Sequence, residues 1–385
     1  MVVMRGVGGA AEAVGSTGTI SFAPFGQKNR VAYILKHMGA LVTMKLIAAR
    51  AGVTQATVSM SLANHPRIPV ATRERIQALA KALGYRPNPY VSTLMRLRRQ
   101  GKPLPDKPAL ALVCALRTAD GWRNHESQTI RQMREGALER ATLRGYRAQE
   151  FWLHREGMSN ERFSEMLRAR GIQGLLLSPL AEGDPPPDLH WDYFAAVSMS
   201  VPLPGRTIMT VCNDHFGSCV LAVRECHKRG YRRPGLALRE VHRHRFQGRW
   251  QAGYLAAGEM MRDLTLVEPL WVDDWNEAVG VQVGRWLERE RPDVVINLGG
   301  ARLRDLIEGT GRRIPEDIGF AWLACPEKDD PLSGVWQNGR LIGVSAADAL
   351  IGLVESNERG MPDHATTIML NGKWNEGGTL RLLPS

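Results

Sequence analysis

Residues 46–65 read LIAARAGVTQATVSMSLANH, and this stretch decides the fold of the first part of the chain. The apolar run at 46–49 predicts one face of a helix, and Gly52 supplies a residue that adopts positive φ without a Cβ penalty. Thr54 follows at the position of an N-cap, where its hydroxyl satisfies a backbone N–H at the start of a second short helix. The spacing predicts a helix-turn-helix.

The second helix of this motif divides into an inner and an outer set of side chains. Ala56, Val58 and Leu62 are expected to pack inward. The outer set is expected to be Gln55, Thr57, Ser59 and Met60. Short polar side chains at the N-terminal end of such a helix can approach base edges closely in the major groove. The motif therefore predicts DNA binding.

The charge distribution favours the same function. Between residues 41 and 107 the chain has twelve Lys and Arg against two acids, so this segment carries +10 of the chain's net charge of +11. A basic block on an otherwise neutral chain is typical of phosphate contacts, which supply most non-specific affinity for DNA. A solvated basic helix surface is the alternative, but its coincidence with a helix-turn-helix favours DNA.

Length and composition indicate a globular protein of two or three domains. The chain has 385 residues, of which 44% are hydrophobic and 23% charged. No stretch approaches eighteen consecutive apolar residues, so we expect no membrane partner. The five cysteines form no CxxC pair and lack His or acidic partners at zinc spacing, which indicates free, mostly buried thiols in the cytoplasm and no metal site or cofactor.

The sequence divides into four parts. Residues 1–42 are expected to be a disordered extension, because most of this stretch is rich in Gly, Ala and Ser. Residues 43–88 form the DNA-binding head, which ends with a third helix that has Thr72 as its candidate N-cap. Residues 89–108 are a hinge helix and linker, set off by the prolines at 87 and 89. Residues 109–385 are expected to form a two-lobed domain for dimerisation and ligand binding.

The long C-terminal part alternates between strand-like and helical patterns. Apolar strand-like runs are expected at 109–116, 145–153, 174–179, 193–199, 234–240, 269–272, 293–298, 318–324 and 366–370. Helices are expected at 127–144, 160–170, 215–229, 248–262, 276–290, 301–309 and 342–359. Alternation with short loops predicts parallel sheets covered on both faces, and so many strands predict two doubly wound lobes. Ligands in such folds bind at the carboxyl ends of the strands, here between the lobes.

Taken together, these segments resemble the LacI/GalR family of bacterial transcription regulators. The most specific match is MKLIAARAGVTQATVSMSLANHPRIPVATRERIQALAKALGYRPNP at 44–89, and further similarity lies in HKRGYRRPGLA at 227–237, GRRIPEDIGFAWL at 311–323 and GRLIGVSAADALIGL at 339–353. The resemblance implies an α/β protein with an all-α helix-turn-helix head and a periplasmic-binding-protein-like core. It also implies a homodimeric repressor that places two recognition helices on a palindromic double-stranded DNA operator.

The resemblance also implies roles for particular residues of the head and hinge. Thr54, Gln55, Ala56, Thr57 and Ser59 match positions of base and phosphate contact, and Gln55 suits bidentate pairing with adenine. Met60 departs from the arginine that many members carry, so contact with a thymine methyl is a possible replacement. Tyr85 and Asn88 match residues that touch the DNA backbone, although Tyr85 suits core packing equally well. Leu94 occupies the position of the leucine that the family's hinge helix inserts into the minor groove.

The ligand-binding half departs further from the family. Trp250 stands where the family often has a ligand-gripping arginine, with Arg249 one place earlier, and Gly299-Gly300 replaces an Asn-Asp pair whose acid commonly holds sugar hydroxyls. Trp122, Trp250 and Trp275 are candidates for stacking on a sugar-like ring, but core or interface packing explains a tryptophan more often. We therefore expect a small molecule between the lobes that depends on Arg249 and aromatic contacts; an orphan regulator without a ligand is the alternative.

Other classes of protein fit less well. The sequence has no G-x-S-x-G, Walker A, H-E-x-x-H or dinucleotide-binding signature, so we expect no catalytic residues and no enzyme. A periplasmic solute-binding protein would share the two-lobed core, but it would have a secretory signal and no basic head.

Overall fold

The structure is a computed structural model that describes residues 43–62, 67–83, 85, 108–181 and 183–382. The chain divides into two compact units, Met1–Asn88 and Pro89–Ser385. The expected extension at 1–42 and nearly all of the expected hinge at 89–108 lie outside the described residues. No helix in the described parts is long and apolar enough to cross a membrane.

The first unit contains three helices, α2 (Met44–Ala51), α3 (Gln55–Leu62) and α4 (Val70–Ala82), around a small core. Ile47, Val58 and Ile76 contribute one fully buried side chain from each helix. Gly52 ends α2 in the left-handed conformation (φ 67°, ψ 34°) and its N–H bonds the carbonyl oxygen of Ala48. The predicted helix-turn-helix is therefore present, and its tight turn uses the conformational freedom of glycine.

The third helix begins earlier than expected. It begins at Val70 after Pro69, which provides no side-chain cap, so Thr72 lies inside the helix and the prediction of a Thr72 cap was wrong. Proline has no N–H to donate. An N–H at the residue before a helix has no partner within the helix, so Pro69 costs no hydrogen bond there. The signal that was missed is a proline directly before an apolar-periodic run.

The second unit contains two six-stranded sheets. The first sheet is entirely parallel in the order β11-β5-β4-β3-β1-β2, and the second has the order β12-β10-β9-β8-β6-β7 with β12 antiparallel to β10. The strands of the first sheet are β1 (Ala109–Cys114), β2 (Arg147–Trp152), β3 (Gly174–Leu177), β4 (Ala195–Met199), β5 (Met209–Asn213) and β11 (Thr367–Leu370). Those of the second are β6 (Pro234–Arg239), β7 (Leu270–Val272), β8 (Val294–Asn297), β9 (Gly319–Cys325), β10 (Gly334–Trp336) and β12 (Lys373–Asn375).

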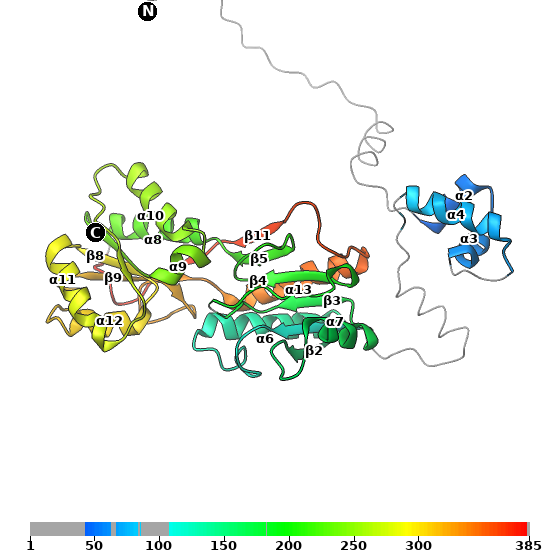
Figure 1. Ribbon diagram of the computed structural model, residues 1–385. Helices are drawn as coiled ribbons and strands as arrows, with labels where there is room; N and C mark the ends of the chain where they lie inside the picture. The colour runs from blue at the N-terminus through cyan, green and yellow to red at the C-terminus, as the bar shows by residue number, and fades with distance from the viewer. Residues whose placement is uncertain (1–42, 63–66, 84, 86–107, 182, 383–385) are drawn as a thin grey trace, which may run out of the picture. The chain divides into compact units, whose positions relative to one another are not determined.

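Helices cover the sheets, as the alternating pattern predicts. In the first lobe α6 (Gln128–Leu143) and α13 (Gly339–Glu355) pack on one face and α7 (Asn160–Ala169) on the other. In the second lobe the covering helices are α8 (His215–Lys228), α10 (Arg249–Met260), α11 (Gly280–Glu290) and α12 (Gly300–Glu308). Figure 1 shows the two lobes with α13 beside the first sheet. The fold is the predicted two-lobed α/β core.

Short elements escaped the sequence analysis. The strands β10 and β12 have three residues each, and the helix α9 (Glu240–Arg245) has six. Such lengths are too short for a hydrophobic period to be read. The strand β5 (Met209–Asn213) was also absent from the predicted strands. These elements form because neighbouring strands and helices supply their hydrogen bonds and contacts.

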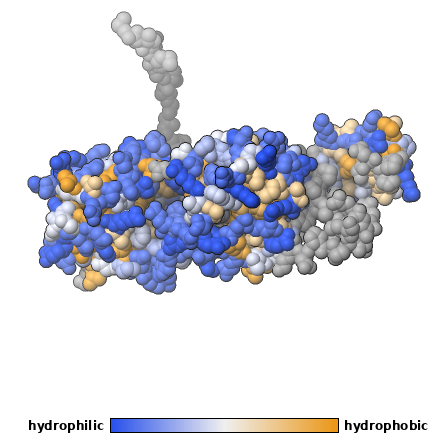
Figure 2. Space-filling view, turned by 60° about the horizontal axis from the view of Figure 1, so that its bottom comes forward, coloured by the Kyte–Doolittle hydropathy of each residue, from blue (hydrophilic) through white to orange (hydrophobic). Residues whose placement is uncertain are grey.

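The displayed surface is mostly hydrophilic, and the cysteine side chains are buried. Figure 2 shows mostly hydrophilic side chains on the displayed face, and the exposed large hydrophobic residues are scattered. All five cysteines are buried and free, as predicted. The described residues contain no group of His, Cys, Asp or Glu that could hold a metal ion.

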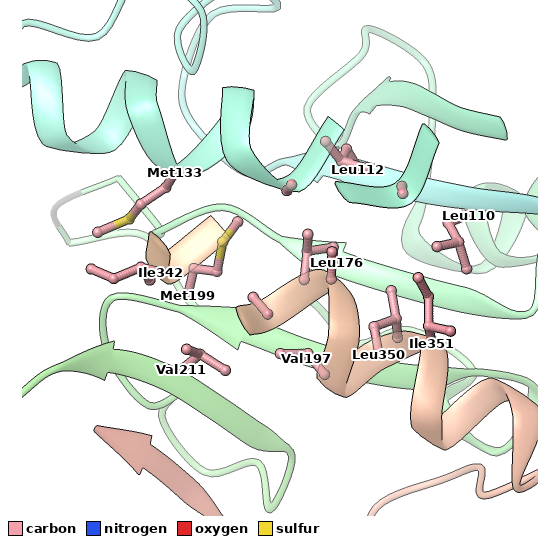
Figure 3. Packing of buried hydrophobic residues seen from close by; sticks show 14 of the residues in the cluster. Leu110, Leu112, Met133, Leu176, Val197, Met199, Val211, Ile342, Leu350 and Ile351 are labelled. Carbon is pink, nitrogen blue, oxygen red and sulfur yellow. The ribbon is translucent and has the colours of Figure 1, made fainter. Parts of the chain in front are cut away.

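The tightest packing in the first lobe joins α6 to α13. The buried core of this face includes Met133 of α6, Ile342 and Leu350 of α13, and Leu176 and Val197 of the sheet (Figure 3). A Cβ at Gly343 would overlap the Met133 carbonyl oxygen and lie 2.8 Å from the Ala137 nitrogen. The two helix backbones therefore touch, and glycine is required for this approach.

A pair of substitutions on α13 tests this packing. Gly343→Ala should lower the free energy of unfolding by about 1–3 kcal/mol, because the backbone of α6 must move to admit the new methyl group. Gly352→Ala is the matched control, because a Cβ there meets nothing within 4 Å and alanine favours the helix by up to about 1 kcal/mol. Thermal unfolding of both variants measures the difference; equal stability of the two would contradict close α6–α13 packing.

Candidate DNA-reading head and interlobe ligand site

The recognition helix α3 begins with a side-chain cap. The Thr57 N–H donates to Thr54 Oγ1 at 3.2 Å, and the two threonine hydroxyls are 2.9 Å apart. The predicted N-cap is therefore present. Capping fixes the first turn of α3 and holds the neighbouring Gln55 at an exposed position.

Only part of the predicted inner and outer division holds. Val58 is fully buried and Leu62 packs half-buried against the head core, as expected. Ala56 is exposed, so its inward placement was wrong, and Ser61 is buried instead with its hydroxyl donating to the Thr57 carbonyl oxygen at 2.8 Å. Because a helix turns 100° per residue, position 56 lies nearly opposite position 58, whereas 58, 61 and 62 share one side.

The outer face of α3 carries the candidate base-reading residues. Gln55 and Ala56 are exposed, and Thr57, Ser59 and Met60 are half-buried. The exposure of Ala56 places a small side chain beside Gln55, which removes a steric obstacle to close approach by a DNA surface. These candidates run along α3 away from its core-facing side, and the two exposed ones lie at its N-terminal end.

The described part of the head is rich in basic side chains. Residues 43–62, 67–83 and 85 include six Lys and Arg but a single acid, Glu74. Arg75 also has a structural role, since its Nη1 donates to the Ala51 carbonyl oxygen at 3.2 Å and ties α4 to the turn. Gln77 similarly donates to the Ser61 carbonyl oxygen at 2.9 Å and ties α4 to the end of α3.

The remaining DNA-contact candidates lie at or beyond the end of α4. Tyr85 packs half-buried against the head core, and burial raises the pKa of its hydroxyl. This position favours the core-packing interpretation of Tyr85 while leaving part of the residue accessible. Asn88 and Leu94 lie outside the described residues.

The three candidate tryptophans of the ligand site are buried in separate clusters. Trp122 and Trp250 are 2% exposed and Trp275 is 7% exposed. Trp122 belongs to the α6–α13 core and donates to the Ile130 carbonyl oxygen at 3.1 Å. Trp250 packs beside His215 and Phe246, and Trp275 packs in the cluster beneath α11 and α12. The structure does not gather the three into one stacking surface.

Arg249 begins α10 in the second lobe and extends toward the first lobe. Its Nη1 lies 3.9 Å from Cys212 Sγ of β5 and 4.0 Å from Met369 Sδ of β11, while its Nη2 donates to Gln247 Oε1 at 3.1 Å. Both sulfur atoms belong to strands of the first sheet. Arg249 therefore bridges the lobes at the carboxyl ends of their strands, where a ligand is expected.

The glycine pair after β8 admits two indole rings. Asn297 Oδ1 accepts hydrogen bonds from the N–H groups of Gly299 and Gly300, each at 3.0 Å. A Cβ at Gly299 would lie 2.9 Å from the Trp275 ring, and one at Gly300 would lie 2.8 Å from the Trp322 ring. Trp322, which the sequence analysis did not single out, thus occupies space beside Gly300. No acid side chain could be added at Gly300 without moving this ring.

Arginine and histidine side chains also collect between the lobes. The α9 residue Arg245 donates from Nη2 to the Leu180 carbonyl oxygen of the first lobe at 3.2 Å. Burial, and then the nearby charge of Arg249, lower the pKa of His215 to about 3. Burial, with Arg239 and Arg245, lowers the pKa of His242 to about 3. Both imidazoles are therefore neutral at pH 7, and the arginines carry the positive charge.

A hollow of about 410 Å³ opens between residues of the two lobes. Its lining joins Gln128, Arg131, Gln132 and Glu135 of α6 to Pro326, Glu327, Lys328, Trp336, Asn338 and Arg340 of the following segments. Gln128 and Glu327 are joined by a side-chain hydrogen bond across the two lobes. The volume suits a small ligand, and the lining is chiefly polar.

Comparison with known proteins agrees with this architecture. Residues 43–88 match the family described as "Bacterial regulatory proteins, lacI family". The chain is 27% identical over 330 residues to the HTH-type transcriptional regulator CelR of Thermobifida fusca, covering 80% of this chain and 91% of that protein. It is 43% identical over 54 residues to the HTH-type transcriptional regulator MalR of Staphylococcus xylosus, covering 14% of this chain and 16% of that protein.

Solved structures share the fold. A complex of the transcriptional regulator CelR with cellobiose aligns at a TM-score of 0.50 and 20% identity, over 88% of this chain and 99% of that one. The lac repressor dimer bound to operator and the anti-inducer ONPF aligns at a TM-score of 0.50 and 20% identity, over 89% and 99%. Residues 43–88 thus form a LacI-family helix-turn-helix DNA-binding region, and the chain as a whole is similar to an HTH-type transcriptional regulator along most of its length.

Proposed function

We propose that this protein is a repressor that binds a palindromic operator as a homodimer in the cytoplasm, and that a small molecule held between the lobes modulates binding. The observation that carries the DNA-binding part is the capped N-terminal end of α3, where Thr54, Gln55 and Ala56 are exposed on a basic head. Amide and hydroxyl groups at this end of a helix can donate to and accept from base edges.

The proposed contacts divide by their chemistry. Gln55 is the adenine-reading residue, and Ala56 and Met60 supply apolar contact to thymine methyl groups. Thr54, Thr57 and Ser59 supply phosphate contacts, and Thr54 also caps α3. Tyr85, Asn88 and Leu94 are proposed to connect the head to the DNA backbone and the minor groove. The chain is divided for this purpose into a head at 43–88, a hinge and linker at 89–108, and a core at 109–385.

The proposed ligand is small and sugar-like, and Arg249 is its principal polar contact. Its position across the two sheets supports this role, because a ligand at the carboxyl ends of the strands would lie beside it. All three tryptophans have little exposed surface, and Trp275 lies beside Gly299. We propose that Trp122 and Trp250 shape the site from within the core, and that stacking on a bound ring needs a movement that exposes them.

An orphan regulator remains the second candidate. Its supporting observation is that Gly300, where the family commonly has an acid, has no side chain and is packed against Trp322. Titration of the operator complex with cellobiose and with other sugars tests it. A ligand changes the operator affinity of a responsive regulator only if it binds the DNA-bound and DNA-free states with different affinities.

Replacement of Gln55 tests base reading. Gln55→Ala should weaken binding to the selected operator by roughly 5- to 150-fold, the loss of about 1–3 kcal/mol from one bidentate base contact. Binding to random DNA should change little, because phosphate contacts remain. Fluorescence anisotropy on both DNAs measures the difference. Gln251→Ala makes the same chemical change on α10 and should leave both affinities unchanged; an equal loss on operator and random DNA would refute base reading by Gln55.

Salt dependence tests the electrostatic contribution of the basic segment. The logarithm of the operator association constant should fall against the logarithm of salt concentration with a slope of about −6 to −10, since bound cations leave the DNA on association. A chain that begins at Lys102 should lose operator binding and retain the thermal unfolding transition of the core. A slope near zero for the full chain would contradict the assignment of the basic segment to phosphate contacts.

Leu94 tests the proposed hinge, for which the evidence is the sequence alone. Leu94→Ala should weaken operator binding and reduce DNA bending while leaving the melting temperature of the free protein nearly unchanged. Bending is measured by fluorescence energy transfer between dyes at the DNA ends. Leu143→Ala, at a residue that is 73% exposed on α6, serves as the control and should preserve both properties. Unchanged bending in the Leu94 variant would show that the wedge is not Leu94.

A further inference from the structure

We propose that the interlobe ligand is an anion, a sugar-sized molecule that carries a carboxylate or phosphate, and that Arg249 pairs with its negative charge. This inference rests on the proposed ligand-responsive function and names the chemical class of the ligand. It follows from an excess of cationic and N–H donor groups between the lobes.

The surroundings of Arg249 lack a strong acceptor for its charge. Its Nη1 contacts two sulfur atoms, Cys212 Sγ and Met369 Sδ, which are weak acceptors, and Gln247 Oε1 accepts from Nη2. Within the described part of the chain, no carboxylate lies at salt-bridge distance from this guanidinium. A half-buried arginine with five donors and one neutral oxygen acceptor has capacity for a bidentate anion.

Further cations face the same boundary. Arg245 reaches from α9 to the Leu180 carbonyl oxygen of the first lobe. Arg131 at the start of α6 donates to the carbonyl oxygens of His125 and Glu126, and no carboxylate of the described residues pairs with it. Burial and the charges of Arg245 and Arg131 lower the pKa of His125 despite the opposing effect of Glu126. The first and second lobes therefore both contribute positive charge to this boundary.

The nearby carboxylates already have partners. Asp214 caps α8 by accepting from the Gly217 N–H at 2.9 Å, and Glu240 lies 3.0 Å from Arg243. Asp274 lies 3.7 Å from Arg239, and Glu126 lies 3.5 Å from Arg302. Glu240, Asp274 and Glu126 thus pair with other arginines, and Asp214 caps a helix. None of the four forms an ion pair with Arg249.

Buried N–H groups around this boundary also lack acceptors. Among the described residues, the Nε1 atoms of Trp250, Trp275 and Trp322 have no hydrogen-bond partner, and neither has the acceptor Asn213 Oδ1. His215 packs against the Trp250 ring, with 4.8 Å between the ring centroids. Trp250 directly follows Arg249 in the chain. Buried donors without acceptors are rare, because each costs the free energy of the lost hydration. Acceptor oxygens on a ligand would suit the indole N–H groups that a movement of the lobes exposes.

Matched ligands on one sugar skeleton test the charge requirement. Binding of glucose, glucuronate and glucose 6-phosphate to the full chain is measured by intrinsic tryptophan fluorescence and calorimetry at constant ionic strength. At least one of the two anions should bind 10-fold or more tightly than glucose, and comparison of the two distinguishes a carboxylate from a phosphate. Glucose binding as tightly as both anions, or no saturable response to either anion, would overturn the proposal.

Substitutions of two arginines test which positive charge binds the anion. Arg249→Gln should weaken binding of the preferred anion by about 10- to 100-fold, and Arg249→Lys should restore part of that loss, because a cation returns without the planar fork. Arg285→Gln removes one charge from an exposed position on α11 and should leave the anion affinity unchanged. Melting temperatures exclude unfolding as the cause. Equal affinities of the Arg249→Gln and Arg285→Gln variants would assign Arg249 to lobe packing and overturn its ligand role.

Operator binding in the same preparations separates the two proposals. A chain that binds operator but neither anion refutes only the anionic ligand. A chain that binds the anion through Arg249 without affinity for any selected DNA refutes the proposed repressor function and leaves the ligand class intact.

Discussion

The arrangement of the core depends on three segments that connect the two lobes. Each segment begins at the carboxyl end of a strand. The chain passes between the sheets after β5, β10 and β11, and hydrogen bonds join these crossings. The Asp214 N–H donates to the Leu370 carbonyl oxygen at 2.9 Å, and Asn213 donates to the Gln337 side chain. Gln337 in turn donates to the Leu323 carbonyl oxygen at 2.6 Å. The two lobes therefore meet through buried amide groups, and the carboxyl edges of both sheets face the same boundary.

This constraint explains why the ligand candidates concentrate where they do. Parallel strands place all of their following loops at one edge, so Asn297, Gly300 and the residues after β6 come together from distant parts of the sequence. Arg249 and Arg245 reach the first lobe because α9 and α10 begin directly after this edge. A change in the angle between the lobes would alter these contacts, which gives a ligand at the boundary a physical means of favouring one arrangement.

The loop after β8 keeps its backbone geometry independently of the side chains that follow it. Asn297 holds the loop through two backbone N–H groups, so the loop geometry does not depend on the residues that follow. Gly299 and Gly300 then leave room for the rings of Trp275 and Trp322. This end of β8 is therefore lined by indole rings. The same backbone can serve a ligand of a different charge.

The sequence by itself determined the helix-turn-helix, the basic segment, and the alternation that produces two parallel sheets. These features follow from local rules, namely capping at Thr54, positive φ at Gly52 and the hydrophobic period of long helices and strands. Local rules also explain the burial of Ser61 in place of Ala56 and the start of α4 after Pro69, although the sequence analysis misread them. Tertiary structure alone decided the short strands β10 and β12. It also decided that three tryptophans lie in separate clusters, that Trp322 covers Gly300, and that Arg249 reaches across the lobes. These contacts join residues that are far apart in the chain, and their distances depend on how sheets and helices pack, which no local pattern encodes.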